Sequence, residues 1–241
     1  MINSIEEKRA HKTRKVIKMI GTVIGIVVVA EILALLWLAS TVSSYKSYWE
    51  TQAKIPGEIT YLALGDSAAQ GIGATSPRSG YVGVLAERIS EQSGKTVRVV
   101  NLSKTGAKMN DYLKEQAPQI NDTDADVVSI EIGANDVAKF NPQTFRADFK
   151  KVLKTLPDDS YVSNMPLFNS RPASTDKAKQ ASVIIAEELQ AYPKLHFVDL
   201  QKQTQENQSI FGFAPDLFHP NNLSYKNWAD AFWIKMQEHL R

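Results

Sequence analysis

Ser67 stands directly after an apolar run that predicts a strand, in the segment Leu64-Gly65-Asp66-Ser67. A serine just beyond the carboxyl end of a strand is well placed to act as a nucleophile. Its hydroxyl group is weak at its own pKa, so it needs an adjacent base, an acid that orients the base, and donors for the oxyanion. Ser67 is therefore a candidate nucleophile. The alternative is that it only caps the helix that follows.

His219 is the histidine best placed to serve as that base. It lies in the loop Pro215-Asp216-Leu217-Phe218-His219-Pro220, just before the last predicted helix, where it can project toward the same rim of a sheet as Ser67. Asp216 can hold one ring nitrogen of His219 while the other faces Ser67. The other three histidines lie in a basic N-terminal arm, inside a predicted strand and two residues from the C-terminus: His11, His196 and His239.

Two further segments offer hydrogen-bond donors at the ends of predicted strands. The side-chain amide of Asn135 follows the third strand in Gly133-Ala134-Asn135-Asp136, and the backbone N–H of Gly106 follows the second. Both can donate to an oxyanion, because the carboxyl ends of parallel strands meet at one edge of a sheet. The alternative for Asn135 and Asp136 is a turn pair that bonds its own backbone. We expect Asp66 and Asp136 to be structural.

Short apolar runs alternate with segments of helical period, which predicts a parallel sheet covered on both faces and joined by right-handed crossovers. The predicted strands are 59–64, 97–102, 127–132, 161–163 and 195–200. The predicted helices are 81–92, 110–116, 143–155, 175–192 and 224–240. In the last helix, Trp228 and Trp233 fall on the face that we expect to pack in the core.

Residues 19–38 form an apolar segment long enough to cross a hydrocarbon core of roughly 30 Å. Glu31 is its only charged residue, and we expect it to be tolerated there. Basic residues precede the segment, so the positive-inside rule places the N-terminus in the cytoplasm and the rest outside. A cleavable signal peptide is the alternative, but its apolar region is usually only about 7 to 15 residues long.

The composition excludes several function classes. The chain has 28 Lys plus Arg against 26 Asp plus Glu, and residues 1–18 alone carry a net charge of +4. The remainder is not basic, so we expect no nucleic-acid partner. There is no cysteine, which excludes disulfides, thiolate nucleophiles and thiolate metal sites. No metalloprotease, EF-hand or P-loop motif is present, and we expect no metal and no cofactor.

Four short blocks resemble, in order and spacing, those of the SGNH (GDSL-type) hydrolases. They are Gly65-Asp66-Ser67, Gly106, Gly133-Ala134-Asn135-Asp136 and Asp216-Leu217-Phe218-His219, and the resemblance spans about residues 59–240. Ala68 departs from the family, which has leucine there, but this neighbour does no chemistry. The resemblance implies an α/β fold: a three-layer α/β/α sandwich with a five-stranded parallel flavodoxin-like sheet, preceded here by one transmembrane helix.

The same resemblance implies hydrolysis of carboxylic esters through an acyl-enzyme. Ser67 would be the nucleophile, His219 the general base and Asp216 its orienting acid. The oxyanion hole would consist of the N–H groups of Ser67 and Gly106 and the side chain of Asn135. The domain prediction is a basic cytoplasmic arm (1–18), a transmembrane anchor (19–40), a linker (41–57) and an SGNH hydrolase domain (58–241).

We therefore predict a serine esterase on the outer face of the cell membrane that cleaves small acyl esters or O-acetyl groups on glycans. The alternatives are a lipase or lysophospholipase that acts on lipid esters, and a non-catalytic domain that binds acylated cell-wall polymers. Residues 168–172 and 203–213 should shape the pocket, and no long apolar insertion suits a lipid tunnel. Nearby apolar residues would favour an apolar acyl group or form loop core: Phe211, Phe213, Leu217 and Phe218. We make no prediction of oligomeric state.

Overall fold

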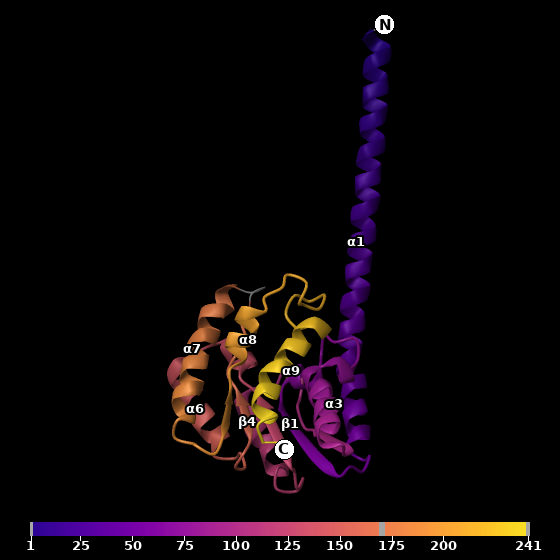
Figure 1. Ribbon diagram of the computed structural model, residues 1–241. Helices are drawn as coiled ribbons and strands as arrows, with labels where there is room; N and C mark the ends of the chain where they lie inside the picture. Colours follow the sequence, from indigo (N-terminus) through magenta and orange to yellow (C-terminus); the bar gives the residue numbers. More distant parts are fainter. Residues whose placement is uncertain (1, 169–171, 240–241) are drawn as a thin grey trace. The chain divides into compact units, whose positions relative to one another are not determined.

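Figure 1 shows a computed structural model of the chain, which describes residues 2–168 and 172–239. The chain divides into two compact units, Met1–Ser40 and Thr41–Arg241. Helix α1 (Ile2–Gln52) supplies the first unit and the beginning of the second. Its stretch from Ile17 onward is, within the described residues, the one helix long and apolar enough to cross a membrane, with a mean hydropathy of 2.6 over 18 residues.

The second unit is built on a five-stranded parallel sheet in the order β2-β1-β3-β4-β5, which confirms the predicted flavodoxin-like sheet. The strands are β1 (Ile59–Gly65), β2 (Val97–Asn101), β3 (Val127–Glu131), β4 (Tyr161–Ser163) and β5 (His196–Val198). The interior strand β1 is buried along its whole length, as expected for a strand covered on both faces.

Helices cover both faces of the sheet and complete the three layers (Figure 1). Tyr61 and Ala63 of β1 face α3 (Tyr81–Ser93) and α9 (Asn222–Met236), whereas Leu62 and Leu64 face the other core. That second core is filled from α4 (Met109–Glu115), α6 (Pro142–Leu153) and α7 (Pro172–Leu189). The alternation follows from the period of two in a strand.

Several short helices lie outside the predicted helical ranges. They are α2 (Ser67–Gln70), α5 (Ala134–Val137), α8 (Leu200–Glu206) and the 3₁₀ turns η1 (Pro77–Ser79) and η2 (Ala117–Gln119). The predicted strand 195–200 ends at Val198, because Asp199 caps α8 by accepting a hydrogen bond from the Lys202 N–H at 3.1 Å. The last residue of the predicted helix 224–240, Leu240, lies outside the described residues.

The segment expected to form a linker, 41–57, is helical as far as Gln52. The Tyr45 hydroxyl donates to the Ala74 carbonyl at 2.7 Å, and the Trp49 Nε1–H donates to the Gln70 carbonyl at 3.0 Å. Both aromatic side chains are buried. Their spacing of four residues places them on one helix face, which gives this polar segment a side that packs on the rest of the second unit.

Candidate active site

The turn from β1 into α2 fixes the position of Ser67. Gly65 has φ +144°, and a Cβ there would lie 2.2 Å from the Glu131 carbonyl oxygen, so the chain can pass only with glycine at this point. Asp66 then caps α2 by accepting a hydrogen bond from the Ala68 N–H at 3.0 Å. Ser67 is the first residue of α2 and is 6% exposed. Its hydroxyl group therefore has a defined direction at the carboxyl end of β1.

His219 lies between Ser67 and Asp216. The Ser67 Oγ lies 3.0 Å from His219 Nε2, and His219 Nδ1 lies 2.5 Å from Asp216 Oδ2. With the proton on Nδ1, the imidazole donates to Asp216 and accepts from the Ser67 hydroxyl. The structure thus brings together the three side chains that the sequence singled out, across 152 residues of chain between Ser67 and His219.

The loop itself holds the Asp216 carboxylate in place. Its Oδ1 accepts hydrogen bonds from the backbone N–H groups of Phe218 and His219, at 3.0 and 3.1 Å. Leu217 adopts a left-handed conformation with φ 53°, which lets the chain turn between Asp216 and His219. Burial acts to raise the pKa of Asp216, but the hydrogen bonds and charge of His219 and the N–H of Phe218 outweigh it and lower that pKa.

Backbone contacts hold the loop that carries His219 in shape and place it against the segment after α2. Residues Phe213 and Pro220 form an antiparallel bridge, and the Ala214 N–H donates to the His219 carbonyl at 2.8 Å. A Cβ at Gly73 would lie 2.4 Å from the Pro220 carbonyl oxygen, so the loop sits directly on Gly73. The distance between His219 and Ser67 thus depends on close backbone packing.

Two of the expected oxyanion donors are free to act. The backbone N–H groups of Ser67 and Gly106 have no hydrogen-bond acceptor within the described part of the chain. Gly106 has φ +79°, a conformation that glycine adopts without strain. The third expected donor, Asn135, already uses its amide group: Nδ2 donates to Asp66 Oδ2 and to the Ala107 carbonyl, both at 3.0 Å.

Asp66 and Asp136 have the structural contacts expected of them. Asp66 caps α2 and accepts from Asn135, while Asp136 accepts from the Met109 N–H at 3.2 Å. Burial raises the pKa of Asp66, and the charge of nearby Asp136 adds to that effect. Burial also raises the pKa of Asp136 to about 6. Together these contacts connect the ends of β1 and β3 with the segment after β2.

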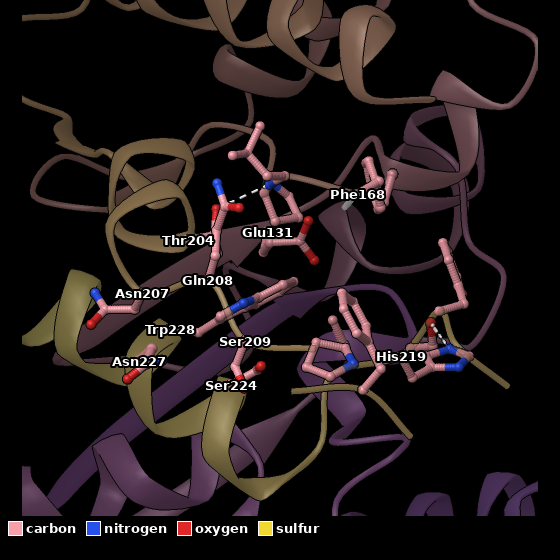
Figure 2. A pocket seen from close by; sticks show the side chains of 18 of the residues that line it. Glu131, Phe168, Thr204, Asn207, Gln208, Ser209, His219, Ser224, Asn227 and Trp228 are labelled. Atoms are coloured by element: carbon pink, nitrogen blue, oxygen red, sulfur yellow. Dashed lines mark hydrogen bonds between the residues drawn. The ribbon is translucent and has the colours of Figure 1, made fainter. Parts of the chain in front are cut away.

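A pocket of about 710 Å³, including its open mouth, lies beside Ser67 and His219 (Figure 2). Its apolar lining comes from Ala134, Pro166, Leu167, Phe168, Phe213 and Phe218. Polar side chains from α8, α9 and the loop between them also line it: Thr204, Asn207, Gln208, Ser209, Ser224 and Asn227. Trp228, expected in the core, lies in the core cluster and also lines this pocket. The lining is therefore mixed rather than a hydrocarbon tunnel.

Both segments expected to shape the pocket contribute to it. Phe168 comes from the first, and Asn207, Gln208 and Phe213 come from the second. Asn169, Ser170 and Arg171 of the first segment lie outside the described residues. Phe211 and Leu217 are exposed, so they are not loop core.

One lining residue, Glu131, was not identified from the sequence. It is the last residue of β3, its side chain is 0% exposed, and neither carboxyl oxygen has a hydrogen-bond partner. A charged residue at the end of an otherwise apolar strand was the available signal. Within residues 2–168 and 172–239, no group of three or more His, Asp or Glu side chains is placed to hold a metal ion.

Comparison with known proteins adds independent information. Residues 63–226 match the GDSL-like Lipase/Acylhydrolase family. The chain is 26% identical over 206 residues to the uncharacterized protein YpmR of Bacillus subtilis (strain 168), an overlap of 72% of this chain and 80% of that protein.

Solved structures share the fold. The lipase/acylhydrolase from Enterococcus faecalis superimposes with a TM-score of 0.64 at 20% identity, covering 76% of this chain and 97% of that one. Axe2, an acetylxylan esterase from Geobacillus stearothermophilus, gives a TM-score of 0.60 at 22% identity, covering 76% and 96%.

Proposed function

Because the chain belongs to the GDSL-like lipase/acylhydrolase family, we propose that Ser67, His219 and Asp216 hydrolyse carboxylic esters as nucleophile, general base and orienting acid. Membership confirms the resemblance predicted from the four sequence blocks, and it makes the chain a carboxylic ester hydrolase. The observation that carries the assignment of roles is the hydrogen-bonded series from Ser67 through His219 to Asp216.

The reaction follows from that geometry. Ser67 Oγ attacks the ester carbonyl carbon while its proton passes to His219 Nε2. The oxyanion accepts hydrogen bonds from the N–H groups of Ser67 and Gly106. His219 then protonates the leaving alkoxide, and the alcohol departs from the acyl-enzyme. Water attacks the acyl group with His219 again as base, which releases the carboxylic acid and restores Ser67.

We assign the third oxyanion donor to Asn135. Its amide group lies between Asp66 and Ala107, so it must exchange one of these two acceptors for the oxyanion. The Ala107 carbonyl is neutral, whereas Asp66 carries a carboxyl group, and hydrogen bonds to charged groups are the stronger ones. We therefore expect the hydrogen bond from Asn135 to the Ala107 carbonyl to break when the oxyanion forms.

The direct test is the Ser67→Ala variant of the full chain in detergent, assayed on p-nitrophenyl acetate. We expect kcat to fall at least about 10⁴-fold, because the covalent intermediate cannot form. A fluorophosphonate probe should label the wild type and not the variant. Ser79→Ala, in the 3₁₀ turn after α2, is the control and should keep both activity and labelling. Equal activity of Ser67→Ala and wild type would disprove the assignment, and an unlabelled, inactive wild type would favour a non-catalytic binding domain.

For substrates we propose small acyl esters or O-acetyl groups on glycans. The mixed polar and apolar lining of the pocket supports this, since a sugar or short acyl group presents both kinds of surface. Axe2, which shares the fold, is an acetylxylan esterase, and solved catalytic mutants of it replace a serine or a histidine. Rates on acetyl, butyryl and octanoyl esters should therefore fall with chain length.

Lipid esters are the second candidate, because Ile210 and Phe211 in the loop before the catalytic residues are 84% and 77% exposed. Such exposed apolar side chains suit contact with a lipid surface. An octanoyl optimum in the same ester series would favour this alternative over short acyl groups.

We also propose that the enzyme is held on the outer face of the cell membrane by residues 19–40. The length and hydropathy of this part of α1 support an anchor, and the basic residues before it support a cytoplasmic N-terminus. An acylated glycan or a lipid would then be within reach of the active site.

A further inference from the structure

Glu131 is a buried acidic residue that lines the pocket and whose carboxyl group has no hydrogen-bond partner within the described part of the chain. Its side chain is 0% exposed and lines the pocket together with Ser67 and His219, yet both carboxyl oxygens lack a hydrogen-bond partner. Figure 2 shows its carboxyl group turned toward the hollow framed by Phe168 and Trp228. Leaving a buried polar group unsatisfied is costly, and such groups in native proteins usually have a functional reason.

The surroundings of Glu131 favour its uncharged form. The charge of Asp66 acts on the pKa of Glu131, and the charge of Glu131 acts on the pKa of Tyr81 and Tyr225. None of these groups is a cation. No lysine or arginine is among the described residues that line the pocket. Burial first, and the negative charge of Asp66 second, raise the pKa of Glu131 well above its ordinary value.

A neutral carboxyl group has one O–H donor and one carbonyl acceptor, and a hydroxyl group can satisfy either of them. We propose that Glu131 is a specificity-determining residue that hydrogen-bonds a hydroxyl group carried by the ester substrate. An ester without this hydroxyl leaves Glu131 unsatisfied, which is how a polar site rejects a hydrocarbon of the same size.

The rest of the pocket fits a hydroxylated ligand. Gln208, Ser209, Ser224 and Asn227 line it along with Glu131, and they supply further donors and acceptors at different points of the wall. Trp228 adds an apolar surface to the same lining. A polyhydroxylated group, such as a sugar, matches this combination better than an alkyl chain does.

The pocket lies on one side of Ser67. In the sheet order, β2 and the Gly106 donor lie on one side of β1, whereas Glu131, Phe168 and α8 lie toward β3, β4 and β5. The hydroxyl group can belong to the acyl part or to the alcohol part of the ester, and the experiment needs one matched pair for each.

The inference rests on the proposed esterase function and is tested on the full chain in detergent. The acyl pair is p-nitrophenyl 3-hydroxybutyrate and p-nitrophenyl butyrate, and the alcohol pair is glycerol monoacetate and propyl acetate. We expect kcat/KM of wild type to favour the hydroxylated ester of at least one pair by about ten- to hundredfold.

Two substitutions identify Glu131 as the source of that ratio. Glu131→Gln keeps a donor and an acceptor and should keep the preference, whereas Glu131→Met has similar volume without polar atoms and should reduce the ratio to about one. Asp136→Asn is the control, because Asp136 is a half-buried carboxyl near the site that does not line the pocket. It should leave the ratio as in wild type.

The outcomes separate the two proposals. If wild type hydrolyses no ester faster than Ser67→Ala, the esterase function itself fails. If wild type is active but shows no preference in either pair, or if Glu131→Met keeps the preference, only the role of Glu131 is disproved. Loss of the preference in Glu131→Gln would also disprove the role of Glu131. It would mean that an ionised carboxylate, and not a neutral carboxyl group, binds the hydroxyl group of the substrate. The wild-type ratio needs no variant, so the test stands even if Glu131→Met does not fold.

Discussion

Asp216 shows how a single side chain can be fixed by the loop that also presents its partner. Its two oxygens accept from the His219 ring and from two backbone N–H groups, so the carboxylate is oriented by three hydrogen bonds. These bonds outweigh the effect of burial and keep the pKa of Asp216 low. Its proposed role is to hold the proton of the imidazole on Nδ1, which leaves Nε2 free to accept from Ser67.

Asp216→Asn is expected to lower kcat about 10³- to 10⁴-fold, because an amide can donate to Nδ1 and then favours the wrong imidazole tautomer. Hydrolysis of p-nitrophenyl acetate by the full chain measures this. Asp230→Asn removes the α9 carboxylate that forms an ion pair with Arg88, outside the loop and not among the residues that line the pocket, and it should retain kcat. Equal losses in both variants would point to general destabilisation instead.

Glu131→Gln is expected to change how stability depends on pH. The folded protein keeps the Glu131 proton above pH 4.5, the ordinary pKa of the group, where the unfolded chain has lost it. The folded state then binds more protons, so the contribution of Glu131 to stability is fully present below that value and is lost as pH rises through the folded pKa. Glutamine does not ionise, so the variant gains relative to wild type as pH rises, by at most about 1.4 kcal/mol per pH unit.

Denaturant unfolding of both proteins at about pH 5 and about pH 8 measures that gain. A difference between variant and wild type that stays constant over this range would contradict the raised pKa of Glu131.

At the scale of elements, the end of α1 is part of the catalytic unit. Trp49 is 3% exposed and belongs to the same core cluster as α3 and α9. Through its bond to the Gln70 carbonyl it contacts the last residue of α2, the short helix that begins with Ser67. The packing of the α1 end therefore supports the position of Ser67, the proposed nucleophile.

Trp49→Ala is expected to lower the free energy of unfolding by about 3–5 kcal/mol, because it removes a buried indole and its hydrogen bond. Trp49→Phe should cost less, about 1–3 kcal/mol, since it mainly leaves the Gln70 carbonyl unsatisfied. Lys46→Ala, on the exposed side of the same helix, should change stability by no more than about 0.5 kcal/mol. Equal stability of Trp49→Ala and wild type would show that residues 41–52 do not pack on the domain.

At the scale of the whole molecule, the charge distribution and the apolar helix together support a membrane-bound hydrolase. The N-terminal arm has a net charge of +4, while the whole chain has only +2. The remaining residues are close to neutral and slightly acidic, so the catalytic unit has no electrostatic preference for a polyanion. Attachment to a membrane would instead define where the enzyme meets its substrate.

The full chain should stay with the membrane fraction after an alkaline carbonate wash, whereas a chain without residues 1–40 should be released, because it lacks the apolar segment. External protease should reach the catalytic unit in intact cells if the N-terminus is cytoplasmic. Replacing the six basic residues of the arm by glutamine should lower the protected fraction of the N-terminus. A shortened mature protein found in the medium would instead favour a cleavable signal peptide.

The sequence by itself determined the sheet, its layers and the family, because strand and helix periods and four motif blocks are local patterns that need no knowledge of packing. It also singled out Ser67, Asp216 and His219, since a nucleophile and its partners must stand at strand ends and loops. It did not predict that residues 41–52 form a packed helix. The segment is polar on average, and its aromatic residues Tyr45 and Trp49 form only one face.

Only the tertiary structure decided which side chains share the pocket. In the sequence, Glu131 is only a residue near the end of a predicted strand. Its lack of a hydrogen-bond partner depends on which side chains the packed helices and loops place around it. The occupied amide of Asn135 and the 3.0 Å approach of His219 to Ser67 likewise depend on contacts between distant segments. Local patterns fix the elements, but hydrogen-bond satisfaction is a property of the packed whole.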